Sequence, residues 1–212
     1  MKIGRTMTMH LSKSHLGSVV AVLGAFFFTP TCLAENLNVV AVHNAPQELA
    51  LKKRLEQLVE KYKLEKWLYT RDIRIDQDVW PPHSHPVLTL GVRDSQFSDD
   101  LYLVGGLLHE EFHWNMVLNS KLMPDETAAL VKTKFPGLNP RRPNGSGDEI
   151  STYNHVLVCY MEYKALASIF GEADAKKAVR GLPFYTDIYA LVSDSGNQEV
   201  IEDLLLQEKV NI

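Results

Sequence analysis

Residues 109–113 read His-Glu-Glu-Phe-His, which is a string of the form H-E-x-x-H. On an α-helix, two histidines four residues apart share one face, so both imidazoles can reach a single metal ion. Glu110 would then face the open coordination position of that ion, where a carboxylate can take a proton from water. The motif therefore predicts one zinc ion held by His109 and His113, with Glu110 as the general base.

This chemistry requires residues 99–119 to form a helix. Ser98 is a good N-cap residue, and Asp99 and Asp100 place negative charge near the positive end of the helix dipole. Apolar residues recur at helical spacing through the segment, at Leu101, Val104, Leu108, Phe112 and Met116. The sequence therefore predicts an amphipathic helix that carries the motif.

A catalytic zinc needs a third protein ligand, and a second long helix, predicted at 148–170, can supply one. His155, Cys159 and Glu162 fall at positions i, i+4 and i+7 of this helix. The same face carries apolar residues, namely Val158, Leu166 and Ile169. Because the face should turn to the core, its histidine and glutamate need polar partners there.

We expect His155 to be the third ligand, with Glu162 and then Glu149 as the alternatives. If His155 binds the ion, Glu162 becomes a carboxylate that orients an imidazole from outside the ligand set. The interpretation without a metal is that His155 is a hydrogen-bonded core histidine and Glu162 a partly exposed member of a salt bridge.

Other polar residues near the motif have weaker signals. His83 and His85 lie in the Pro-rich segment WPPHSHP, which is typical of a solvated turn. Glu111 is expected at the edge of a cleft or in solvent. A tyrosine can stabilise a developing oxyanion, and five are candidates: Tyr153, Tyr160, Tyr163, Tyr185 and Tyr189. We favour Tyr185 as a catalytic residue, because the preceding Gly-Leu-Pro break could turn it inward.

The string HEEFH resembles the zinc-binding helix of the zincin metallopeptidases. The resemblance implies zinc binding by His109 and His113, proton transfer by Glu110, and an extended substrate along the strand at 87–91. Two positions depart from the zincin pattern, because Glu111 stands where an uncharged residue is usual and Asn115 where an apolar one is commoner. The segments SHPVLTL and STYNHVLVCYMEY also resemble an uncharacterised bacterial family of secreted zincin-like proteins.

The N-terminus has the pattern of a secretory signal peptide at residues 1–34. Three basic residues and no acidic one precede the apolar stretch LGSVVAVLGAFFF, which is too short to span a bilayer comfortably. Pro30 and Ala34 then mark a cleavage site before Glu35. The sequence predicts export to the periplasm or the medium, with a lipoprotein anchored through Cys32 or an uncleaved anchor as less favoured alternatives.

Residues 35–212 should form one domain. This part of the chain has 19 basic and 26 acidic residues, a net charge of −7, so nucleic acid is an unsuitable partner. Cys159 is its one cysteine, which leaves no internal disulfide. Periodicity predicts a helix at 46–64, strands at 67–75 and 86–93, a short helix at 125–134, a loop at 136–147, and two or three helices after 170. Strands before helices predict an α+β fold, a mostly helical zincin-like domain with a small β-sheet preceding the motif helix.

The sequence as a whole predicts an exported zinc-dependent hydrolase, a metallopeptidase acting on a peptide or protein substrate. One alternative is a zincin-like binding or scaffolding protein that keeps the metal without turnover. The other is a structural helical domain in which HEEFH occurs by coincidence. The sequence does not specify a cleavage preference or an oligomeric state.

Overall fold

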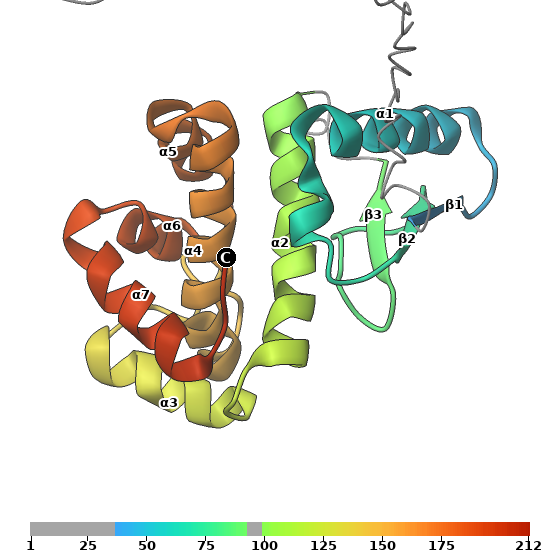
Figure 1. The fold of residues 1–212 in the computed structure, drawn as a ribbon. Coiled ribbons are helices and arrows are strands. Elements are labelled where there is room, and N and C mark those ends of the chain that lie inside the picture. The colour runs from blue at the N-terminus through green and yellow to red at the C-terminus, as the bar shows by residue number, and fades with distance from the viewer. Residues whose placement is uncertain (1–36, 93–98) are drawn as a thin grey trace, which may run out of the picture. The chain divides into compact units, whose positions relative to one another are not determined.

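A small parallel β-sheet precedes a group of packed helices (Figure 1). The computed structural model describes residues 37–92 and 99–212. The predicted signal peptide, Cys32 and the predicted cap Ser98 lie outside the described residues. The sheet has the order β1-β2-β3, with strands β1 (Asn38–Ala41), β2 (Asp72–Asp76) and β3 (Leu88–Gly91). The predicted α+β class is confirmed.

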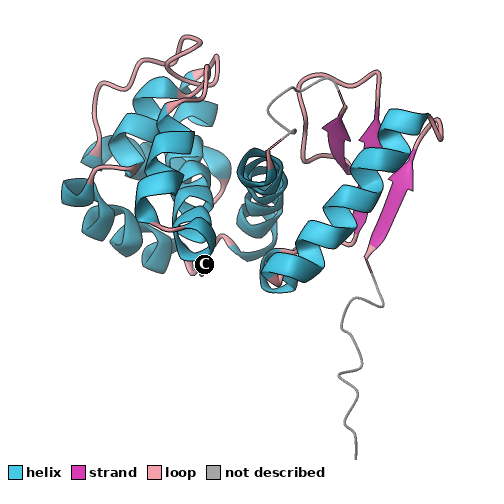
Figure 2. Ribbon diagram, turned by 90° about the horizontal axis from the view of Figure 1, so that it is seen from above, coloured by secondary structure: helices cyan, strands magenta, loops and turns pink. Residues whose placement is uncertain are grey.

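Burial alternates along β1 and β2 and is continuous in β3. Ile73 of β2 pairs with Val39 on one side and Leu88 on the other, and all three side chains are buried. Helix α1 (Pro46–Tyr62) makes the crossover that a parallel β1–β2 pair requires, and it packs along both strands (Figure 2). The sheet thus has an apolar face covered by α1.

The strand predicted at 67–75 begins too early. Lys63 adopts a left-handed conformation with φ of 53°, which ends α1, and a short 3₁₀ helix, η2 (Leu64–Trp67), follows. Leu64 and Trp67 are buried in the core, so the apolar residues that suggested a strand serve packing instead of pairing. Strand β1 was not predicted, because four residues alternating between exposed and buried give little signal.

The helical part is built around α4. Its members are α2 (Asp100–Asn119), α3 (Pro124–Lys134), α4 (Glu149–Phe170), α5 (Glu172–Arg180), α6 (Thr186–Val192) and α7 (Ser195–Glu208). Helix α4 packs against all five others, which explains why it is apolar on nearly every side. Figure 1 shows α2 between the sheet and the remaining helices. The two helices that carry the predicted ligands therefore face each other.

The start of α2 is fixed by two aspartates. The side chain of Asp99 accepts a hydrogen bond from the Leu101 amide at 2.8 Å, so Asp99 is the N-cap in place of the predicted Ser98. Asp100 forms ion pairs of 2.9 Å with both Arg54 and Lys61 of α1. The centre of the predicted apolar stripe is fully buried, at Val104, Leu108 and Phe112.

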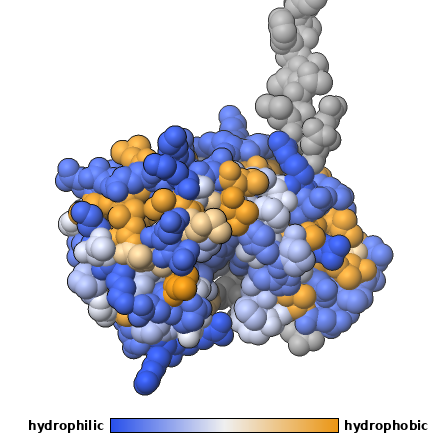
Figure 3. All heavy atoms as spheres, turned by 90° about the horizontal axis from the view of Figure 1, so that it is seen from below, coloured by the Kyte–Doolittle hydropathy of each residue, from blue (hydrophilic) through white to orange (hydrophobic). Residues whose placement is uncertain are grey.

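Hydrophilic and hydrophobic residues are mixed over the face seen in Figure 3. This face is hollowed between the helical group and the part of the molecule that holds the sheet. No helix within residues 37–92 and 99–212 has the length and apolar character needed to cross a membrane.

Candidate metal centre

Three histidines meet where α2 packs against α4. His109 and His113 come from successive turns of α2, and His155 comes from α4. One nitrogen of each ring lies within 4.8 Å of the others. The ring centroids are 5.1 Å apart for His109 and His113 and 4.8 Å apart for His113 and His155. Three imidazoles gathered at this separation can serve as ligands of one metal ion, which is the donor set of many catalytic zinc sites.

A buried carboxylate holds the far side of His109. The Nδ1 atom of His109 lies 2.9 Å from Oε2 of Glu162, and the same oxygen accepts a 2.7 Å hydrogen bond from the Tyr189 hydroxyl. Burial lowers the pKa of His109, but the Cys159 thiol and the Glu162 carboxylate beside it raise the pKa well above its usual range. With Nδ1 engaged by Glu162, Nε2 is the nitrogen left for a metal.

His155 is oriented in the same way by its own helix. Its Nδ1 lies 2.7 Å from the Ser151 carbonyl oxygen, one turn earlier in α4. Burial and the nearby His109 lower the pKa of His155 to about 4, so its ring is neutral at pH 7. Burial and the two neighbouring histidines lower the pKa of His113 well below its usual value. Neutral imidazoles offer the lone pair that a metal requires.

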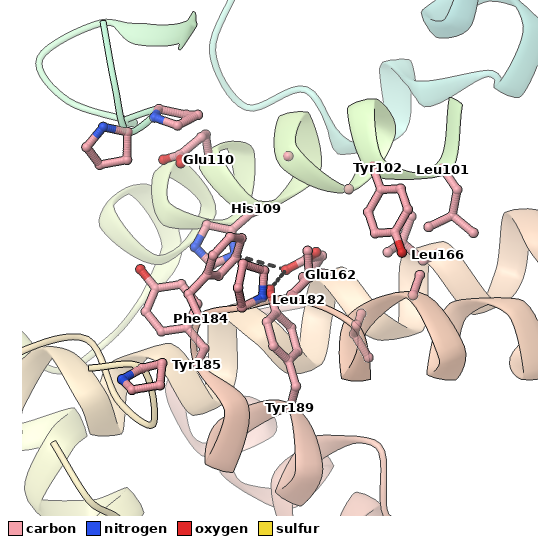
Figure 4. A pocket seen from close by; sticks show the side chains of 18 of the residues that line it. Leu101, Tyr102, His109, Glu110, Glu162, Leu166, Leu182, Phe184, Tyr185 and Tyr189 are labelled. Carbon is pink, nitrogen blue, oxygen red and sulfur yellow. Dashed lines mark hydrogen bonds and ion pairs between the residues drawn. The ribbon is translucent and has the colours of Figure 1, made fainter. Parts of the chain in front are cut away.

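Glu110 lies beside this cluster and lines the same pocket as His109. Figure 4 shows its carboxylate on the opposite side of His109 from Glu162. The residue is 8% exposed, and burial raises the pKa of its carboxyl. A carboxylate with a raised pKa is a better proton acceptor near neutral pH than an ordinary glutamate.

Tyr185 closes another side of the cluster. Its ring stacks on His109 at a centroid distance of 5.6 Å and an interplanar angle of 11°, and it lies 4.6 Å from the ring of His155. Its backbone is left-handed, with φ of 54°, at the start of α6 just after the Gly-Leu-Pro break. The structure thus brings Tyr185 to the histidines, as the sequence suggested.

The other candidate tyrosines act elsewhere in the fold. Tyr189 bonds to Glu162, while Tyr160 donates to Glu202 at 2.6 Å and Tyr163 donates to Glu172. Tyr153 is buried in α4 and lies under the amine of Lys132. Of the five tyrosines, only Tyr185 packs on two of the three histidines.

The alternative ligands occupy different places. Glu149 is at the first turn of α4 and forms a 2.6 Å ion pair with Lys132, so it lies away from the histidines. Glu162 belongs to a second group with His109 and Cys159, all three of them buried. That group uses the side of His109 that Glu162 already engages. The geometry therefore favours His155 as the third ligand.

Glu111 and Asn115, the two departures from the zincin pattern, are structural. Glu111 is fully buried, and its Oε2 accepts hydrogen bonds from the amides of Tyr69 at 2.7 Å and Thr70 at 3.0 Å. The prediction that Glu111 lies at a cleft edge or in solvent is wrong, because these two amides need an acceptor inside the fold. Burial raises its pKa to about 7. Asn115 donates to the Asn211 carbonyl at 2.9 Å and fixes the C-terminal segment.

The Pro-rich segment between β2 and β3 lies over α2. His83 and His85 are exposed, as predicted, but His85 stacks on Trp114 at 4.3 Å and the Trp114 indole donates to the Ser84 carbonyl. The backbone of His83 pairs with Thr89 of β3 in both directions. This pairing occupies the outer edge of β3 at its centre, where the resemblance to zincins placed an extended substrate.

A pocket of about 310 Å³ opens beside His109 and Glu110. Sequence reasoning missed most of its lining, which includes Trp80 and Pro82 from the Pro-rich segment, Arg142 from the loop before α4, and apolar residues of α4 and α5. The pair Gly105-Gly106, one turn before the motif, was the feature of the sequence that could have indicated a pocket beside α2. Glycines there leave one turn of α2 without side chains where it lines the pocket.

Comparison with protein-family models, curated proteins and solved structures finds no match to this chain.

Proposed function

We propose that this protein is an exported zinc-dependent hydrolase, specifically a peptidase related to the zincins. His109, His113 and His155 would hold one zinc ion. The observation that carries the proposal is the arrangement around His109, with Glu162 on Nδ1 and two further imidazoles that each bring a nitrogen within 4.8 Å of one of its nitrogens. Carboxylate support of a ligand imidazole is usual at catalytic zinc sites, whereas a core histidine needs no such cluster.

Zinc bound there supplies Lewis acidity, which polarises a substrate carbonyl and makes water a stronger acid. Glu110 takes the proton from the attacking water and returns it to the departing amine. Tyr185 donates from its hydroxyl to the oxyanion that develops on the carbonyl. Glu162 keeps the His109 ring in one orientation and one tautomer. The apolar lining of the pocket limits the access of bulk water.

A binding or scaffolding protein that keeps the metal without turnover is the second candidate. Two features of the sequence favour it: the absence of a recognisable specificity signature, and the charged residue at position 111, where zincin peptidases usually have an uncharged one. Glu111 accepts hydrogen bonds from the backbone amides of Tyr69 and Thr70. Its charge therefore has a structural role and no longer favours a scaffolding protein. The presence of Glu110 in the pocket beside His109 favours turnover.

Replacement of Glu110 separates these functions. Glu110→Gln keeps the shape of the side chain but cannot accept the proton, so we expect unchanged zinc content and hydrolysis of a peptide library reduced by 10²-fold or more, on the order expected for a general base. Glu56→Gln on the surface of α1 is the matched control and should change neither quantity.

Three results would count against the peptidase. Absence of zinc from the wild-type protein after growth in zinc-supplemented medium would favour a structural helical domain in which HEEFH occurs by coincidence. Zinc without any cleavage by the wild type would favour the scaffolding protein. Equal cleavage by wild type and Glu110→Gln would show that Glu110 is not the base.

A further inference from the structure

The pocket continues from the metal centre along α2 toward its first turn. Leu101, Gly105 and His109 are spaced four residues apart, so they form one stripe of the helix that faces the pocket. Figure 4 shows Leu101 and Tyr102 at the end away from His109, across from Leu166 of α4. The pocket therefore has a chemical end at His109 and Glu110 and a distant end that we call the apolar arm.

Aliphatic side chains from three elements make up the apolar arm. Its aliphatic lining residues are Leu101 from α2, Leu166 from α4, and Ala178 and Val179 from α5, and Tyr102 of α2 adds one hydroxyl at this end. Leu166, Ala178 and Val179 are each at most 5% exposed, so packing inside the fold holds these lining side chains in place. The arm itself contributes no charged side chain.

The charged residues of the pocket gather at its other end. They are His109, Glu110, Glu162 and Arg142. Glu162 is engaged by His109 and Tyr189 through its Oε2 atom. A charged ligand group entering the apolar arm would lose its water without gaining a partner of opposite charge, which is costly.

Gly105 marks the junction between the two ends. A Cβ at this position would lie 3.3 Å from Oε1 of Glu162 and 3.4 Å from Cδ1 of Leu166. The glycine therefore allows α2 and α4 to approach closely while leaving the passage between the metal centre and the arm open.

We propose that the apolar arm is the specificity pocket of the hydrolase and takes one large apolar side chain, of the leucine, methionine or phenylalanine kind, from a residue flanking the scissile bond. This inference rests on the proposed function. The volume of about 310 Å³ is at the lower end of the range of ligand sites, which suits one side chain with part of its backbone. Continuity with Glu110 and His109 places the adjoining peptide bond at the reacting groups.

The cleavage-site profile of a peptide library, read by mass spectrometry, tests the pocket. Wild-type protein should prefer leucine over alanine at one position beside the cleaved bond by about 100-fold or more, because even one methylene in an apolar pocket contributes roughly 10–200-fold. Ala178→Leu fills the arm, so it should remove this preference and retain cleavage next to small residues. Ala173→Leu on the exposed side of the same helix is the matched control and should keep the wild-type profile.

A second variant covers the case in which Ala178→Leu does not fold. Leu182 is half-buried and lines the pocket, and Leu182→Ala should widen the pocket and move the preference toward phenylalanine and tryptophan. Cleavage with no preference for large apolar residues, or a profile unchanged in both variants, would overturn the proposal while leaving the peptidase function intact.

A binding measurement separates the failure of the pocket from the failure of the peptidase. N-acetyl-leucine amide should perturb the NMR signals of Leu101, Leu166 and Val179 in zinc-free protein, whereas N-acetyl-glycine amide should not. Binding of the leucine amide without cleavage of any peptide would support the pocket and contradict turnover. Equal responses to the two amides would contradict the pocket.

Discussion

The Nδ1 atom of His109 lies 2.9 Å from Oε2 of Glu162, across the contact between α2 and α4. The Tyr189 hydroxyl donates to the same oxygen at 2.7 Å, so the carboxylate itself is held in place from α6. Three helices thus determine the orientation of one imidazole. Because Nδ1 faces Glu162, the Nε2 atom of His109 is directed to the side where a metal would bind.

Glu162→Gln should therefore weaken zinc binding without abolishing it. The amide oxygen can still accept from His109, but the negative charge that makes the imidazole a stronger ligand is lost. We expect a loss of about 10–100-fold in zinc affinity, measured by competition with a fluorescent chelator. Glu202→Gln, which changes a carboxylate of α7 that accepts a hydrogen bond from Tyr160, is the control and should keep wild-type affinity. Unchanged affinity in Glu162→Gln would show that this contact does not act on a metal.

Loss of a ligand should have a larger effect. His155→Ala and His113→Ala each leave two protein ligands, which hold zinc poorly, so the purified variants should contain little zinc by mass spectrometry. His85→Ala removes an exposed ring stacked on Trp114 and should retain about one zinc per chain. Full zinc in His155→Ala together with its loss in Glu162→Gln would assign the third ligand to Glu162.

The long helices and their buried faces could be predicted from the sequence. In α2 and α4, apolar residues recur at helical spacing, and the polar residues on those faces had to find partners inside the fold. The sequence pattern therefore predicted that His155 and Glu162 lie close to the HEEFH motif. It favoured His155 over Glu162 as the third ligand but could not decide between them, because the direction of each side chain depends on how α2 and α4 pack.

Contacts made by segments distant in sequence could not be predicted. The role of Glu111 depends on the amides of Tyr69 and Thr70, which a 3₁₀ helix and the start of β2 bring to α2. Trp80 lines the pocket because the segment after β2 folds back over α2. No periodicity in the sequence encodes either arrangement.

Export should leave a shortened chain. The basic N-terminus and the apolar stretch before Ala34 predict cleavage in a bacterial host that secretes the protein. N-terminal sequencing of protein recovered from the periplasm or medium should begin at or near Glu35. Soluble cytoplasmic protein that retains Met1 would contradict the localisation.

Glu48 should make stability depend on acid pH. Its carboxylate is buried and accepts hydrogen bonds from the amides of His43 at 2.8 Å, Ala45 at 3.3 Å and Gln77 at 2.9 Å, which ties the ends of β1 and β2 to α1. Burial raises the pKa of Glu48, but the three amides and the nearby His43 outweigh it, and the net pKa is lowered. The ionised form is therefore favoured in the folded state.

Because the folded pKa is the lower one, the stabilisation is fully present above the unfolded value of about 4.3 and is lost as pH falls through the folded pKa. Glu48→Gln should reduce the free energy of unfolding by about 1–3 kcal/mol at pH 7, measured by urea titration of zinc-free protein. The difference from wild type should shrink below pH 4. A difference that stays constant down to pH 2.5 would show that the charge on Glu48 is not its source.

Tyr185→Phe isolates the last group proposed for catalysis. The substitution keeps the ring that stacks on His109 and His155 and removes only the hydroxyl. If that hydroxyl stabilises the oxyanion, kcat should fall by about 10²–10³-fold, with little change in KM or zinc content. Tyr160→Phe removes a hydroxyl bonded to Glu202 and should leave all three quantities unchanged. Loss of zinc in Tyr185→Phe would instead mean that Tyr185 supports the ligands, since zinc content is measured without substrate and so cannot depend on the oxyanion.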